Sequence, residues 1–228
     1  MVPWETLDEA TVPDGGRLKL MRRGDEWSIR LVEPRGPATE LMNSRLSGSE
    51  EAMATVAAKR LAGIAAPRML IGGYGMGFTL RAALGAFPTG AHITVAEIAP
   101  AVVEWARGPM ADLTNAALAD PRTDVEIGDV GPIIRRGGWD AILLDVDNGP
   151  DGLSRQGNDA LYSDTGLAHA AKALRPGGML IVWSFTPHAT FAKRLARSGL
   201  AVEEMLAPSK GQGRKGTRHT LWVATKRG

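Results

Sequence analysis

Hydrophobic and polar residues alternate along the first part of the chain in the manner of half-buried β-strands. Apolar side chains recur at every second position over residues 18–20 and again over residues 27–31. The polar sequence at 22–25 contains a glycine and suits a tight turn between the two strands. We therefore predict a β-hairpin, which ends at the two prolines within residues 33–37.

A helical pattern follows the hairpin. Ser47 and Glu50 are three residues apart and fit a capping box at a helix N-terminus. The apolar residues beyond them lie on one helical face; they are Met53, Val56, Ala57, Leu61 and Ile64. We place a domain boundary here, with a β-hairpin extension over residues 1–46 and a larger α/β domain over residues 47–228.

From residue 68 onward, short apolar runs alternate with helical segments. The apolar runs are residues 69–71, 93–96, 125–127, 141–144 and 179–183. The helical segments are residues 77–86, 99–107, 130–136, 162–174 and 187–198. Near-continuous apolar strands separated by helices indicate a mostly parallel sheet that is covered on both faces. Residues 201–206 and 219–225 have no helix between them, so we expect an antiparallel pair at the sheet edge.

Composition limits the kinds of protein this can be. The 228 residues, 44% of them apolar and 23% charged, suit a globular protein. The chain has no cysteine, which excludes disulfides, thiolate metal sites and a cysteine nucleophile. The four histidines are scattered, so we expect no metal site. No apolar run approaches the roughly 20 residues of a membrane helix, and the N-terminus lacks a signal peptide's apolar core. We expect a cytoplasmic protein with no membrane partner.

Positive charge is concentrated at the C-terminal end. Residues 208–228 contain six of the 27 basic residues and none of the 25 acidic ones. Such a segment could attract an anionic partner. No aromatic side chains interleave with the basic ones over residues 208–218, as stacking on bases would require. A solvated loop is therefore favoured over a nucleic-acid interface.

The loop after the first parallel strand is rich in glycine. Ligands of open α/β sheets bind beyond the carboxyl ends of the strands, so this loop belongs to the expected site. Glycines let the backbone turn tightly and approach a ligand closely. Phe78 stands where a dinucleotide-binding loop would require glycine. The candidate cofactor-binding residues of this loop are Gly73, Tyr74, Gly75, Met76 and Gly77.

Acidic residues follow the next two strands. Glu97 lies twenty positions beyond Gly77, and a carboxylate at that distance suits the two hydroxyls of a ribose. Ile98, beside it, is included in the candidate cofactor site. Gly128 and Asp129 follow the third strand, where Asp129 could also cap the next helix.

The densest polar group of the chain follows the fourth strand. Asp145, Asp147 and Asn148 lie within four positions, at the expected reaction centre. We take these three residues as candidate catalytic groups. An Asx turn at 147–149 would explain two of them without any chemistry.

These features, taken together, resemble the spermidine synthase-like branch of the class I S-adenosylmethionine-dependent methyltransferase superfamily, over about residues 40–206. The matching segments are Ile71-Gly72-Gly73, Thr79-Leu80-Arg81, and residues 139–145, 161–163 and 174–178. The resemblance implies a Rossmann-like α/β fold, with a mostly parallel seven-stranded sheet, an antiparallel edge hairpin and a small N-terminal β-hairpin and helix. It also implies that Asp129 contacts the adenine of S-adenosylmethionine and that Asp145 lies at both the donor and the acceptor.

Two departures from that branch bear on function. Aminopropyltransferases have an acid within the glycine loop, where this chain has Tyr74, Gly75 and Met76. Their two aspartates after the fourth strand are three apart, whereas Asp145 and Asp147 are two apart. A loop without an acid would accept the carboxylate of intact S-adenosylmethionine, which an acid about 4 Å away would repel by a few kcal/mol.

We therefore predict methyl transfer from S-adenosylmethionine to a small, nitrogen-containing acceptor. Asp145 or Asp147 would position this acceptor and take its proton. Asn148 and Tyr162 would orient it, and Asn43 and Glu50 would close the pocket.

Two other functions stay open at this point. One is an aminopropyltransferase that uses decarboxylated S-adenosylmethionine and a polyamine. The other is a nucleoside-binding or regulatory module whose basic loop contacts nucleic acid, tested by salt-dependent retention of DNA or RNA. The hairpin around Trp27 could form a homodimer contact or a lid.

Overall fold

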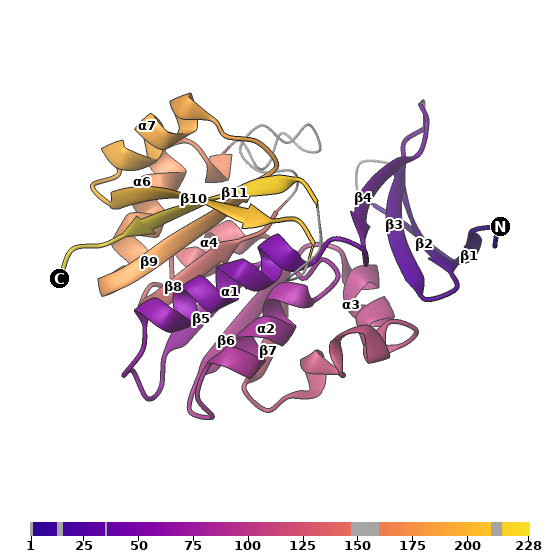
Figure 1. The fold of residues 1–228 in the computed structure, drawn as a ribbon, viewed down its shortest axis with the longest axis horizontal. Helices are drawn as coiled ribbons and strands as arrows, with labels where there is room; N and C mark the ends of the chain where they lie inside the picture. The colour runs from indigo at the N-terminus through magenta and orange to yellow at the C-terminus, as the bar shows by residue number, and fades with distance from the viewer. Residues whose placement is uncertain (1, 13–15, 35, 147–159, 211–215) are drawn as a thin grey trace.

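The protein folds around two β-sheets (Figure 1). The computed structural model describes residues 2–12, 16–34, 36–146, 160–210 and 216–228. A small antiparallel sheet forms the N-terminal part, and a seven-stranded sheet flanked by helices forms the rest. The α/β fold predicted from the sequence is therefore confirmed.

The N-terminal sheet contains the predicted hairpin and two further strands. Its strands are β1 (Glu5–Thr11), β2 (Arg17–Arg23), β3 (Glu26–Val32) and β4 (Thr39–Asn43), in this spatial order. β2 and β3 are the hairpin, and Leu20 pairs with Ile29 as two fully buried residues. The sequence did not predict β1 and β4 because most of their residues are at least partly exposed, which leaves no alternating apolar face.

The large sheet is parallel at its centre and antiparallel at one edge. Its strands are β5 (Arg68–Gly72), β6 (His92–Glu97), β7 (Thr123–Ile127), β8 (Trp139–Leu144), β9 (Leu174–Ser184), β10 (Ala201–Pro208) and β11 (Arg218–Thr225). The spatial order is β10-β11-β9-β8-β5-β6-β7. Strands β5 to β9 pair in parallel, and β11 pairs antiparallel to both β9 and β10. The C-terminal pair predicted from the sequence is confirmed.

Helices cover both faces of this sheet. The helices are α1 (Gly48–Arg60), α2 (Phe78–Ala86), α3 (Pro100–Arg107), α4 (Val130–Ile134), α6 (Asp164–Ala173) and α7 (Ala189–Arg197), with short 3₁₀ segments η1 (Ala111–Thr114) and η2 (Ala117–Ala119). Alternate residues of each strand face opposite layers. In β5, Met69 and Ile71 pack with α1, α2 and α3, and Leu70 packs with α4, α6 and α7. This two-sided burial explains why the central strands are continuously apolar.

The N-terminal sheet packs against the larger unit. Leu18, Leu20 and Ile29 join the same hydrophobic cluster as α1 and α3. The indole Nε1 of Trp105 in α3 donates a hydrogen bond of 2.7 Å to Asp8 Oδ2 in β1. The N-terminal sheet thus contacts the larger unit at α3, beside which it lies in Figure 1.

Helix α1 begins where predicted, but without the predicted capping box. Ser47 is the N-cap residue, yet its side chain makes no capping hydrogen bond. Glu50 Oε2 is buried and has no hydrogen-bond partner among the described residues, so this oxygen closes no capping box.

Among the described ranges, no helix is long and apolar enough to cross a membrane.

Candidate active site

The glycine-rich loop joins β5 to α2 at the carboxyl edge of the large sheet. Gly73, Gly75 and Gly77 have φ angles of 82°, 58° and 77°, which side chains other than glycine adopt at a cost. The Gly73 N–H donates to Ala96 O at 2.8 Å, and the Gly77 N–H donates to Tyr74 O at 2.8 Å. The loop is therefore tied to the neighbouring strand β6 and closed by its own turn.

The side chains within this loop point away from the sheet edge. Tyr74 and Met76 are 4% and 2% exposed and belong to the hydrophobic core. The Tyr74 hydroxyl lies 3.2 Å from Thr114 Oγ1. If these two predicted cofactor-binding residues contact a ligand, they do so through their backbone.

Glu97 holds the glycine loop in place. Its Oε2 accepts a hydrogen bond of 2.9 Å from the Tyr74 N–H, and its Oε1 accepts one of 2.8 Å from the Ala99 N–H. Burial raises the pKa of Glu97, while the backbone N–H donors around it oppose that rise. The structure thus gives Glu97 a role in positioning the loop, and ribose binding stays a prediction.

Exposed apolar side chains flank Glu97 at the same edge. Ile98 follows β6 and is 52% exposed, and Ile127 ends β7 and is also 52% exposed. Asp129 is exposed and caps α4, since its Oδ1 accepts from the Gly131 N–H at 2.8 Å. Sequence analysis missed Ile127, although its place at the end of a strand could have indicated it.

Asp145 follows β8, beside the glycine loop. Its backbone N–H donates to Gly72 O at 3.1 Å, and its Oδ2 accepts from Thr79 Oγ1 at 3.3 Å. Burial raises the pKa of the Asp145 carboxyl to about 6, and the bond from Thr79 limits this rise. The predicted catalytic residues Asp147 and Asn148 lie outside the described residues.

Glu50 lies near Asp145, although it comes from a different element. Burial raises the pKa of Glu50 well above its ordinary value of 4.5, and the charge of Asp145 adds to this rise. Its Oε2 is buried and has no hydrogen-bond partner in the described part of the chain. Two carboxyl groups with raised pKa values therefore share one end of the site.

The other two predicted substrate-binding residues differ in their placement. Tyr162 donates a hydrogen bond of 3.5 Å to Val146 O, which places it beside the end of β8. Asn43 instead binds within the N-terminal part, donating to Glu40 Oε2 at 3.2 Å and accepting from the Arg45 N–H at 3.0 Å. The structure thus brings Tyr162 to the residue after Asp145, and among the described residues it shows no such contact for Asn43.

A buried polar cluster that the sequence did not indicate supports the first turn of α1. Ser49 Oγ accepts from Trp183 Nε1 at 2.9 Å and lies 2.8 Å from His219 Nδ1. Because an indole N–H can only donate, Ser49 Oγ is the acceptor of the bond from Trp183, and its contact with His219 Nδ1 takes the direction that the imidazole tautomer sets. Burial lowers the pKa of His219, which favours the neutral imidazole.

Replacing Ser49 with alanine should lower the free energy of unfolding by about 1–3 kcal/mol, because it leaves two buried nitrogens without a partner. Urea denaturation measures this change. Thr55→Ala is the matched control, since Thr55 is exposed on the same helix and should change stability by less than about 0.5 kcal/mol. Equal effects of the two substitutions would show that the cluster adds nothing to stability.

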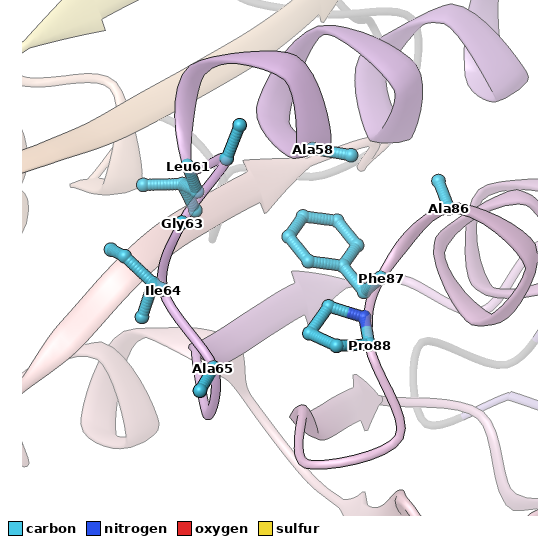
Figure 2. Close-up of a pocket in the computed structure, with 9 residues that line it drawn as sticks. Ala58, Leu61, Gly63, Ile64, Ala65, Ala86, Phe87 and Pro88 are labelled. Atoms are coloured by element: carbon cyan, nitrogen blue, oxygen red, sulfur yellow. The ribbon is translucent and has the colours of Figure 1, made fainter.

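A cavity of about 520 Å³ opens at the opposite edge of the sheet (Figure 2). It lies where α1 and α2 end, before the first residues of β5 and β6. Its lining residues, which include Leu61, Ile64, Phe87 and Pro88, have no charged side chain. We therefore place the candidate site at the carboxyl edge and not at this cavity.

Comparisons with known proteins show which proteins the chain resembles. No family model matches the sequence. The polyamine aminopropyltransferase of Mycobacterium tuberculosis (strain H37Rv) is 36% identical over 106 residues, as is that of Mycobacterium bovis. Each match covers 43% of this chain and only 19% of the relative's length.

Solved structures of spermidine synthases share the fold. The enzyme of Thermotoga maritima matches with a TM-score of 0.73 and 16% identity, covering 97% of this chain and 72% of that one. A spermidine synthase in complex with the transition-state analogue AdoDATO matches with a TM-score of 0.72 at the same identity and coverage. An O-methyltransferase family protein from Burkholderia thailandensis matches less well, with a TM-score of 0.52 and 78% of this chain covered. The resemblance to the spermidine synthase-like branch, inferred from the sequence, is confirmed at the level of the fold.

Proposed function

We propose that this protein is an aminopropyltransferase, which transfers the aminopropyl group of decarboxylated S-adenosylmethionine to a small amine. The observation that supports this best is the buried pair of acids, Glu50 and Asp145, beside the glycine loop. Both substrates are cations, and buried carboxylates stabilise cations. The aminopropyltransferases among the relatives support the same reaction type.

The prediction of methyl transfer from intact S-adenosylmethionine is wrong. The curated relatives are polyamine aminopropyltransferases, and spermidine synthases match more of the chain than the O-methyltransferase family protein does. The prediction failed because it considered acids only within the glycine loop. Glu50 and Asp145 come from other elements and make this end of the site unfavourable for the carboxylate of S-adenosylmethionine.

The proposed reaction is a displacement at carbon. The acceptor nitrogen forms a bond to the propyl carbon next to the sulfonium, and the carbon–sulfur bond breaks with its electron pair staying on sulfur. The products are an aminopropylated amine and 5′-methylthioadenosine. The protein's part is to align the nitrogen with this carbon and to accept a proton from the amine.

Asp145 is suited to be the proton acceptor. With a pKa of about 6, its carboxyl is ionised at neutral pH, yet it is a stronger base than an exposed aspartate. The hydrogen bond from Thr79 fixes the carboxylate at the start of α2. Tyr162, held beside Val146, would orient the acceptor.

The adenosine part of the donor would lie over β5, β6 and β7. The glycine loop borders this region, and Glu97, which holds that loop, remains the candidate for the ribose. The exposed side chains of Ile98 and Ile127 offer apolar contact for the base. Asp129 stays the candidate for the adenine amino group.

A turnover assay tests this function. The protein is incubated with decarboxylated S-adenosylmethionine and a panel of diamines, and the products are identified by mass spectrometry. We expect 5′-methylthioadenosine and an amine heavier by one aminopropyl group, in equal amounts. Absence of both products from a folded, donor-bound sample would reject the proposal.

A further inference from the structure

The first turn of α1 is anchored on both sides of Glu50. On one side, Ser49 binds Trp183 of β9 and His219 of β11. On the other side, Glu51 Oε1 forms an ion pair of 2.6 Å with Arg81 of α2, the helix that follows β5. Strand β8 lies between β9 and β5 in the sheet, and α1 contacts it. Glu50 is therefore held over the carboxyl end of β8, where Asp145 begins the following loop.

One carboxyl oxygen of Glu50 is left without a hydrogen-bond partner among the described residues. Glu51 uses the nearby guanidinium of Arg81, and Asp145 receives the hydroxyl of Thr79. Glu50 Oε2 is buried and has no partner among the described residues. A buried carboxyl oxygen without a donor is costly, so its retention calls for an explanation.

We propose that Glu50 is the specificity-determining residue that binds the primary ammonium group of a substrate. This inference rests on the proposed aminopropyl transfer and deepens it. An ammonium group supplies the missing hydrogen-bond donor to Glu50 Oε2, and it adds a positive charge to that of Arg81 beside the two acids. Glu50 thus takes over, from α1, the task that a glycine-loop acid has in aminopropyltransferases and that Tyr74, Gly75 and Met76 cannot perform.

The electrostatics of the pair support this role. In the free protein, burial and the charge of Asp145 keep the pKa of Glu50 well above its ordinary value. A bound ammonium group stabilises the ionised form and lowers that pKa again. Ammonium binding and protonation of Glu50 should therefore oppose each other, so donor binding should weaken as the pH falls, which a structural residue would not cause.

Donor and acceptor both end in an ammonium group, and ligand titrations distinguish them. Calorimetry at neutral pH compares decarboxylated S-adenosylmethionine with 5′-methylthioadenosine, which has the same nucleoside but no ammonium group. Glu50→Gln should weaken binding of the decarboxylated donor about 10- to 100-fold and change the affinity for 5′-methylthioadenosine less than twofold. The same titrations at lower pH should show that the affinity for the decarboxylated donor depends more steeply on pH in the wild-type protein than in the variant.

A second arm measures KM for the diamine with saturating donor. A rise of about tenfold in this KM, with unchanged donor affinity, would place the ammonium of the acceptor at Glu50 instead. Glu104→Gln is the matched control, because Glu104 is exposed on α3 and the substitution removes the same charge. It should leave the donor affinity and the KM for the diamine unchanged.

The outcomes separate the inference from the function on which it rests. If Glu50→Gln weakens both nucleosides equally, or changes neither donor affinity nor KM, the ammonium role of Glu50 is refuted while the enzyme remains an aminopropyltransferase. If the wild-type protein binds neither nucleoside, the proposed function itself fails, and the inference fails with it.

Discussion

Replacing Asp145 with asparagine is expected to lower turnover by two to four orders of magnitude, about the contribution of a general base. Asparagine keeps the shape of the side chain and can still receive the hydroxyl of Thr79, but it cannot accept a proton. The rate should therefore fall while the dissociation constant of 5′-methylthioadenosine stays within a few-fold of the wild type. In the wild-type enzyme, turnover should decline as the pH falls through about 6, because Asp145 becomes protonated there.

The same substitution should stabilise the folded protein at neutral pH. Burial raises the folded-state pKa of Asp145 from 3.8 to about 6, so the native state binds this proton more tightly than the unfolded chain does. The resulting stability is fully present below pH 4 and is lost as the pH rises through 6. Above that range, ionised Asp145 costs on the order of 2–3 kcal/mol, which Asp145→Asn would recover.

Thermal and urea denaturation between pH 4 and pH 8 measure this effect. The two proteins should have similar stability near pH 4 and diverge as the pH rises. Asp124→Asn is the matched control, because Asp124 is exposed on β7 and should show no such divergence. An Asp145→Asn variant that is inactive and also less stable at pH 8 would contradict the assignment of Asp145 as a buried, functional acid.

Replacing Gly73 with alanine is expected to destabilise the protein by about 2–5 kcal/mol and to abolish donor binding. Gly73 has a φ of 82°, and a Cβ atom there would lie 2.8 Å from Asp145 O, a backbone atom that cannot move freely. The methyl group would push the glycine loop away from the end of β8. The loop that faces the donor would then separate from Asp145.

Gly75→Ala is the matched comparison. Gly75 also has a positive φ, of 58°, but the nearest atom to a Cβ there is Met42 Sδ at 3.8 Å. Only the backbone cost of about 1–2 kcal/mol should appear, and donor binding should persist. Urea denaturation and calorimetry on both variants measure the difference, and equal losses would show that the contact between Gly73 and Asp145 is unimportant.

Sequence patterns predicted the features that depend on neighbouring residues. Continuous apolar runs identified the parallel strands, and the spacing of glycines identified the loop before α2. Glu97 was found because it ends a buried strand, and Asp145 because it directly follows one. In these cases the residues that form the pattern are the same residues that form the strand or loop.

The contacts around α1 could not be predicted in this way. Ser49 meets Trp183 and His219 across 134 and 170 positions of the sequence, and no local pattern indicates such pairs. Glu50 fitted a capping box by spacing, but tertiary packing turned its side chain toward Asp145. The sequence analysis expected Glu50 at the pocket, but the donor was chosen from the glycine loop alone, without the charge of Glu50.

The most direct test of the account is a competition between donors in a single reaction. Equal amounts of decarboxylated and intact S-adenosylmethionine are mixed with the wild-type protein and a diamine, and the sulfur-containing products are quantified. We expect 5′-methylthioadenosine to form in step with the aminopropylated amine, while the intact donor is recovered unchanged. Accumulation of S-adenosylhomocysteine, with the decarboxylated donor left intact, would contradict the account.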